Sequence, residues 1–284
     1  MGEPVKLGFN LLLWATHVTD EHWPIIERLK ATGYDGVEVP MFEGTPDHFE
    51  KLGRRLEDVG LAATGVGVMS RGSAVSPDPA ERAVALDHLK WISDCTAALG
   101  ADLVCGPFHQ PLGVFSGRGP TEDELAWCVD VHKSAAQYAQ GLGVAISVEP
   151  LNRFECYVLN TMEQAASLVQ RVGEPNYGYL FDTFHTNIEE DHPLELIPAT
   201  IREINHVHIS ENNRGVPGAG HIDFDAVFRA LKAAGWDGWM TIEAFGSALP
   251  DLAAATKIWR PLFASPEDLY EKGFRLMKDG WARA

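Results

Sequence analysis

Four residues of the types that bind metal ions close short apolar runs in the second half of the chain. They are Glu149, Asp182, His208 and Glu243, in the segments 144–149, 177–182, 204–209 and 239–243. The apolar neighbours predict that each side chain is buried, and a buried charge needs an opposite charge or a metal ion. No lysine lies in these segments. Three carboxylates and one imidazole therefore indicate a site for one divalent cation, such as Mn²⁺, Mg²⁺ or Co²⁺.

Polar side chains that could hold a substrate follow the first three of these runs, namely Glu155, His185 and Arg214. Grouped on loops at one end of the strands, they would bind several hydroxyl groups of a small molecule. Aromatic residues elsewhere suit the apolar faces of a sugar, although each would serve equally well as core: Trp14, Phe108 and Phe245. The expected ligand is therefore small and rich in hydroxyl groups.

Other titratable residues are expected to have structural roles. His206 lies two residues before His208, hence on the same face of its strand and one layer deeper, where a hydrogen-bonded core histidine is expected rather than a ligand. Glu38 closes the second expected strand and could reach the same end of the barrel, but as an acid near Pro40 it is expected to orient a loop. The remaining histidines lack the spacing of ligands, and most are expected to be solvated, with His109 as the exception.

Eight β-branched or apolar runs alternate with eight longer segments that carry helix signals. The expected strands are 5–12, 36–39, 62–68, 103–105, 144–149, 177–182, 204–209 and 239–243. Side-chain oxygens that can cap a helix mark the starts of several segments between and after them: Thr45, Asp78, Thr121, Thr161 and Ser265.

This alternation predicts parallel strands joined by right-handed helical crossovers. We expect residues 1–284 to form a single (β/α)8 TIM barrel, a fold of roughly 250 residues whose active site lies at the carboxyl ends of the strands. A doubly wound open sheet is the alternative, but no Gly-x-Gly-x-x-Gly motif follows the first strand. No linker-like segment divides the chain.

The composition excludes several classes of partner. The 284 residues include 23 Lys and Arg against 40 Asp and Glu, so the net charge of −17 argues against nucleic acids and anionic membranes. No apolar run approaches the roughly 20 residues of a membrane-spanning helix. The 4 cysteines form no Cys-x-x-Cys pair and no signal-peptide pattern is found, so a cytoplasmic location is expected.

Longer motifs surround the four candidate ligands. They read Val-Glu149-Pro-Leu-Asn-Arg-Phe-Glu, Phe-Asp182-Thr-Phe-His, His-Val-His208-Ile-Ser-Glu-Asn-Asn-Arg-Gly and Ile-Glu243-Ala-Phe. In this order, and over nearly the whole chain, the sequence resembles the ketose 3-epimerase family, which includes D-tagatose, D-allulose and L-ribulose 3-epimerases. The resemblance implies a (β/α)8 barrel in which these four ligands bind Mn²⁺ or a similar ion.

The same resemblance assigns roles to the neighbouring residues. It implies that Glu155, His185 and Arg214 hold the C1–C2 end of a ketose, and that the subunits form homodimers or homotetramers. The implied reaction inverts C3 of a free ketohexose or ketopentose through a cis-enediolate, which needs one base on each face of the substrate. We expect Glu149 and Glu243 to be these catalytic bases, because they come from strands three apart around a ring of eight.

Other activities on the same barrel are alternatives. A sugar 1,2-isomerase or an inosose dehydratase-like lyase would use the same metal and enediolate chemistry. A metal-dependent nuclease is disfavoured by the net charge of −17. A non-catalytic sugar-binding protein would not need four ligands.

Overall fold

The computed structural model describes residues 5–284, in which eight parallel strands form a closed barrel. The strands pair in sequence order, and β8 pairs with β1 to close the ring. Each strand overlaps its expected range, and the predicted (β/α)8 fold is confirmed. The strands are β1 (Lys6–Asn10), β2 (Gly36–Pro40), β3 (Ala62–Val66), β4 (Leu103–Gly106), β5 (Ala145–Val148), β6 (Tyr177–Asp182), β7 (Ile204–Ile209) and β8 (Trp239–Ile242).

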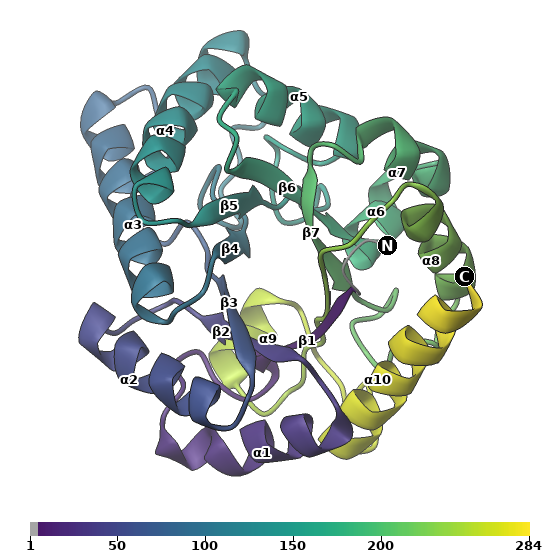
Figure 1. Cartoon of the computed structure of the whole chain (residues 1–284). Coiled ribbons are helices and arrows are strands. Elements are labelled where there is room, and N and C mark those ends of the chain that lie inside the picture. The colour runs from purple at the N-terminus through teal and green to yellow at the C-terminus, as the bar shows by residue number, and fades with distance from the viewer. Residues whose placement is uncertain (1–4) are drawn as a thin grey trace.

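Helices surround the barrel (Figure 1). They are α1 (Trp23–Thr32), α2 (Pro46–Asp58), α3 (Pro79–Ala98), α4 (Glu122–Gln140), α5 (Met162–Val172), α6 (Thr183–Glu189), α7 (Pro193–Thr200), α8 (Phe224–Ala233), α9 (Pro250–Ala255) and α10 (Pro266–Arg283). Short 3-10 helices span Leu11–Leu13 and Asp20–His22. The expected single helical segment was wrong after β6 and after β8, since each of these strands is followed by two helices. Within residues 5–284, no helix is long and apolar enough to cross a lipid bilayer.

Side-chain caps begin most of the expected helices. Asp78 accepts from the Ala80 amide at 2.8 Å at the start of α3. Thr121 and Thr161 form capping boxes with the side chains three residues later, at the starts of α4 and α5. Ser265 caps α10. Thr45 precedes α2 as expected, but its side chain makes no capping hydrogen bond.

The barrel interior beneath the carboxyl ends of the strands is polar. Glu38, Thr64, Cys105 and His206 project into it from β2, β3, β4 and β7, and each side chain is buried. The interior of such barrels is usually filled by branched apolar side chains. Here the larger apolar cluster instead fills the space between the sheet and the helices.

A smaller apolar cluster lies at the carboxyl end of the barrel. Leu12 and Leu180 pack there with Phe245, which follows β8. Ala253 of α9 and Ile258 complete one side of this cluster. The segment between β8 and α10 therefore forms part of the wall around this end of the barrel.

Histidines are buried more often than the sequence indicated. His109 is buried as expected, but His88 and His132 are buried as well. His132 of α4 donates from Nε2 to the carbonyl of Phe108 at 3.0 Å, and its Nδ1 accepts from the Tyr177 hydroxyl. This histidine therefore ties α4 to the ends of β4 and β6, which explains why it is not solvated.

The buried His132 should make the stability depend on pH. Burial lowers the pKa of His132 from 6.5 to about 4. As the pH falls toward and below 6.5, the unfolded chain takes up a proton that the folded chain does not, so the free energy of unfolding falls by about 2 kcal/mol between pH 7.5 and 5. Urea denaturation should therefore show a shallower loss between pH 7.5 and 5 for His132→Gln than for the unsubstituted protein. His192→Gln, at an exposed residue, is the control. Equal pH slopes for all three proteins would contradict this account.

Candidate active site

The carboxyl ends of β5 to β8 bring the four candidate ligands together. One potential ligand atom from each of Glu149, Asp182, His208 and Glu243 lies within 4.8 Å of the others, and all four side chains are buried. His208 Nδ1 lies 3.6 Å from an oxygen of Asp182 and 3.6 Å from an oxygen of Glu243. The structure therefore places at one point the residues that the sequence analysis grouped.

His208 presents a defined nitrogen to this cluster. Its Nε2 lies 2.7 Å from Glu38 Oε1 and must donate to it, because an ionised carboxylate only accepts. Nδ1 is buried and has no hydrogen-bond partner among residues 5–284. Burial alone would lower the pKa of His208, but the charges of Glu38 and Glu243 raise it well above its usual value. The surroundings therefore favour a cation at Nδ1, either a proton or a metal ion.

Glu38 is buried inside the barrel and does not orient a loop, so that expectation was wrong. Its two oxygens accept from both His206 and His208 at 2.7 Å. Burial opposes its charge, but the two histidines more than offset this and hold the pKa of Glu38 well below its usual value. His206 is a hydrogen-bonded core histidine, as expected.

The two candidate bases have different surroundings. Glu243 accepts from Arg214 Nη1 through one oxygen and from Asn10 Nδ2, at 3.1 Å, through the other. For Glu149, the one ion-pair contact among residues 5–284 is with His185 Nε2, at 3.5 Å. Burial, together with the charge of Glu243, raises the pKa of Glu149 well above its usual value. Glu243 is thus held in place by the protein, whereas Glu149 has few protein partners.

Arg214 is the buried cation of the site. Its Nη1 also lies 3.3 Å from Asp182 Oδ2. Its guanidinium is 3.9 Å from the centre of the Phe184 ring and 5.0 Å from that of Phe245, within the range of cation–π attraction. The backbone of Arg214 has a φ of 62°, in the left-handed region that a residue with a Cβ rarely adopts. Such strain is typical of functional sites.

His185 lies against Arg214 in the site. Its Nδ1 lies 3.0 Å from the backbone nitrogen of Asn152, and its Nε2 lies 2.8 Å from Arg214 Nη2. Burial and the charge of Arg214 lower the pKa of His185 to about 3, which keeps the ring neutral. Because a guanidinium only donates, Arg214 is the donor in this contact, and His185 helps to hold it in place.

The other predicted substrate contacts are distributed unevenly. Glu155 is half-buried and accepts from Asn152 Nδ2 at 2.8 Å, which places it next to the His185 side of the site. Phe245 lies against Arg214. Phe108 is fully buried in the main apolar cluster. Trp14 is partly buried, with its ring centre 5.1 Å from that of Phe9. Of these four residues, Glu155 connects with the site through Asn152 and His185, and Phe245 connects with it through Arg214.

Four residues of the site were missed by the sequence analysis as contributors: Asn10, Glu38, Phe184 and Ser210. Ser210 donates to Asp182 Oδ2 at 3.0 Å. Phe184 lies between two residues that were singled out, so its position along the chain was a usable signal. Asn10 and Glu38 reach the site from β1 and β2, and only closure of the barrel brings them there.

The donor set fits a divalent cation. The buried carboxylates of Glu149, Asp182 and Glu243 carry three negative charges, and Arg214 is the one arginine or lysine within residues 5–284 that forms an ion pair with them. The unpaired Nδ1 of His208 faces the same point. Oxygen ligands with one imidazole and no thiolate suit Mn²⁺, Mg²⁺ or Co²⁺ better than a structural zinc ion.

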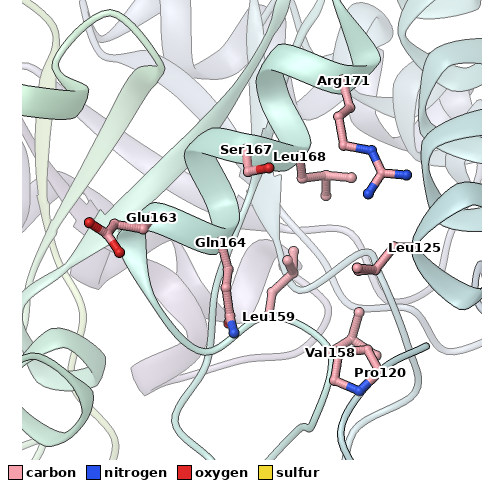
Figure 2. Close-up of a pocket in the computed structure, with 9 residues that line it drawn as sticks. All are labelled: Pro120, Leu125, Val158, Leu159, Glu163, Gln164, Ser167, Leu168 and Arg171. Carbon is pink, nitrogen blue, oxygen red and sulfur yellow. The ribbon is translucent and has the colours of Figure 1, made fainter. Parts of the chain in front are cut away.

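A cavity between α4 and α5 is not part of this site. It measures about 260 Å³ and is lined mainly by apolar side chains such as Leu125, Val158 and Leu168. Figure 2 shows Arg171 at its edge and Glu163 pointing away from the apolar side chains. Arg171 already forms an ion pair with Glu122 at 2.6 Å. The cavity therefore offers no group of side chains with evident chemistry.

Comparison with known proteins gives a consistent result. Residues 26–280 match the model of the xylose isomerase-like TIM barrel family. The chain is 33% identical over 269 residues to a ketose 3-epimerase of Arthrobacter globiformis, and 93% of each chain is covered. It is 31% identical to an L-ribulose 3-epimerase of Mesorhizobium japonicum, over 91% of this chain and 88% of that one. The crystal structure of a D-allulose 3-epimerase from a Methylomonas species, in complex with D-allulose, superposes with a TM-score of 0.90 at 27% identity, covering 98% of this chain and 99% of that one.

Replacing Asp182 by Asn should remove most of the affinity for Mn²⁺. Asp182 also caps α6 by accepting from the amides of Phe184 and His185, and Asn caps as well as Asp does, so the fold should persist. Loss of one charged ligand should weaken binding by more than the roughly 10–100-fold that a change in an outer hydrogen-bond partner costs. Isothermal titration of the metal-free proteins with Mn²⁺ measures this.

Glu155→Gln is the matched control for this experiment, because it also turns a carboxylate into an amide but lies outside the ligand cluster. It should bind Mn²⁺ as the unsubstituted protein does. Unchanged affinity in Asp182→Asn would show that the cluster does not hold the ion.

Proposed function

Because the chain belongs to the xylose isomerase-like TIM barrel family, and within it to the ketose 3-epimerases, we propose that it inverts C3 of a free ketohexose or ketopentose. The enzyme is thus an isomerase that acts on carbohydrates. The observation that carries the proposed reaction is the approach of two glutamates, from β5 and β8, to one buried point beside Arg214 and His185. This arrangement supplies two bases and one fixed cationic donor, Arg214, around one small substrate.

Glu149 and Glu243 are the proposed catalytic bases. The proton on C3 of a ketose is weakly acidic because the neighbouring C2 carbonyl can accept the electron pair, which gives a cis-enediolate. One glutamate removes this proton, and the other, acting from the opposite face, returns a proton to C3. The roles exchange when the reaction runs in reverse, and each base is worth about 10²–10⁴ in rate.

Arg214 and His185 stabilise the charge that develops on the substrate. The guanidinium of Arg214 cannot lose its proton, and the neutral His185 ring, 2.8 Å from Arg214 Nη2, helps to hold it in place. Donors fixed in advance toward a developing oxyanion need no rearrangement during the reaction, which is usually a large part of catalysis. We propose that both bind the oxygens at the C1–C2 end of the ketose, with Glu155 beside them, and that Trp14, Phe108 and Phe245 contribute to the walls of the pocket.

The proposed metal ligands are Glu149, Asp182, His208 and Glu243, and Mn²⁺ is the proposed ion. When bound, a divalent cation would polarise the C2 carbonyl and stabilise negative charge on the substrate oxygens. A glutamate can accept the C3 proton only while it is ionised, so the protonation states of Glu149 and Glu243 decide which of them acts as the base.

We also propose a cytoplasmic location and a homodimer or homotetramer. The four cysteines are unpaired and buried, which suits a reducing compartment.

The proposed association of subunits is supported by exposed apolar side chains. Phe115 and Phe154 are exposed on two loops that touch, since the Gly113 amide donates to the Glu155 carbonyl at 2.9 Å. An exposed apolar surface of this kind favours association.

Glu149→Gln and Glu243→Gln should separate the two faces of the reaction. With each variant saturated with Mn²⁺, epimerisation should fall by about 10²–10⁴. In D₂O, each variant should still exchange the C3 proton of the epimer that its remaining glutamate faces, and should fail with the other epimer. NMR of the recovered ketoses reads this out. Glu163→Gln, an exposed residue outside the site, should behave as the unsubstituted protein. Exchange of both epimers in both variants would rule out the two-base assignment.

Removal of divalent ions should abolish the reaction, and Mn²⁺ should restore it. The assay is a set of unphosphorylated ketohexoses and ketopentoses, analysed for C3 epimers and for aldoses by chromatography. Deuterium at C3 with no aldose supports 3-epimerisation over 1,2-isomerisation and over a dehydratase-like lyase. Full activity after exhaustive chelation would contradict the proposed metal dependence.

A further inference from the structure

We infer that Glu38 is a positioning residue that fixes the ligand His208 and, through Asn10, the base Glu243. This inference depends on the proposed metal-dependent reaction. It concerns a residue that lies beneath the site and touches neither of the proposed substrate-binding residues Arg214 and His185 within hydrogen-bond distance among residues 5–284.

The carboxylate of Glu38 is fully occupied by donors. Oε1 accepts from Asn10 Nδ2 at 3.0 Å and from His208 Nε2 at 2.7 Å. Oε2 accepts from His206 Nε2 at 2.7 Å, from Thr64 Oγ1 at 3.1 Å and from Cys105 Sγ at 3.3 Å. These donors come from β1, β3, β4 and β7. A buried carboxylate held by five donors from four strands has one possible position.

The two oxygens of Glu38 have separable roles. The Oε1 side faces the site, because both of its donors contact the ligand cluster: His208 belongs to it, and Asn10 Nδ2 also donates to Glu243 Oε1 at 3.1 Å. The Oε2 side is bound by groups that are not in this cluster. Loss of the carboxylate should therefore disturb the metal site, whereas loss of a donor to Oε2 should affect only the packing.

The hydrogen bond to His208 decides which ring nitrogen can bind a metal. With its proton held on Nε2 by Glu38, a neutral His208 turns its free electron pair on Nδ1 toward Asp182 and Glu243. Carboxylate partners of ligating histidines act in this way and raise the basicity of the ring. Asn10 adds a second link, since its amide holds Glu38 and Glu243 at a fixed separation.

A second metal site among Glu38, Cys105, His206 and His208 is the competing explanation, because ligand atoms of these four buried residues also lie within 4.8 Å of one another. Both histidines, however, turn an N–H toward Glu38 rather than a free electron pair. The carboxylate of Glu38 already accepts from all five surrounding hydrogen-bond donors. The arrangement is thus that of a hydrogen-bonded unit and not of a metal centre.

Glu38→Gln tests the inference through the affinity for Mn²⁺, measured by titration of the metal-free protein, and not through activity alone. We expect affinity to fall by about 10–100-fold, the usual effect of removing a partner of a ligating histidine. Thr64→Val is the matched control: it removes a donor to Oε2, keeps the volume and leaves His208 and Asn10 bound. It should retain the affinity of the unsubstituted protein.

A spectroscopic measurement distinguishes positioning from packing. In the Mg²⁺-saturated protein, the Nε2–H of His208 should give a downfield proton signal, assigned by its loss in His208→Gln. This signal should persist in Thr64→Val and disappear or move upfield in Glu38→Gln. If Glu38→Gln does not fold, Glu38→Asp keeps the charge but is too short to bind both histidines, and it should show the same loss of affinity.

The outcomes separate this inference from the proposed function. Equal losses of affinity in Glu38→Gln and Thr64→Val, or no loss in either, would overturn the positioning role of Glu38 while the metal site stands. Failure of the unsubstituted protein to bind Mn²⁺ would instead overturn the proposed metal dependence itself.

Discussion

The burial of several carboxylates at one end of the barrel is the constraint on which the rest of the structure depends. Glu38, Glu149, Asp182 and Glu243 are each no more than 4% exposed. Two like charges about 4 Å apart repel by roughly 4 kcal/mol even at an effective dielectric constant of about 20. The fold can hold these groups only if cations and donors are placed among them. Arg214 and the buried histidines meet part of this need, and the proposed metal ion would meet the rest.

The strands and the grouping of ligands could be predicted because both depend on local sequence. An acidic residue or histidine after an apolar run marks the end of a buried strand, as at Glu149 and Asp182, and parallel strands bring such ends to one side of a barrel. The helix starts at Asp78 and Thr121 were predictable for the same reason, since a cap involves residues two or three positions apart. Residues 5–284 contain ten α-helices instead of the expected eight, because the connections after β6 and β8 each hold a second helix.

The roles of Asn10 and Glu38 could not be predicted from local sequence. The hydrogen bond between Glu38 and His208 joins residues 170 positions apart, and that between Asn10 and Glu243 joins residues 233 apart. Both depend on the order of strands around the closed ring and on their register. A single acidic residue near a proline does not indicate the order or the register of the strands. The burial of His132 was missed for a similar reason, since its partners, Phe108 and Tyr177, lie on different strand ends.

The position of Arg214 follows from the need to neutralise the buried carboxylates. Its guanidinium contacts two of the proposed metal ligands, Asp182 and Glu243, so it and the proposed divalent cation would neutralise the same carboxylates. The rings of Phe184 and Phe245 flank the guanidinium and hold it by contacts that do not depend on those carboxylates. If the proposed metal ion took over part of the negative charge, Arg214 would keep its place beside His185 and its N–H groups would become available to a substrate oxygen. The backbone of Arg214 is left-handed, which costs of order 1–3 kcal/mol. The ring contacts and ion pairs of its side chain together offset this cost.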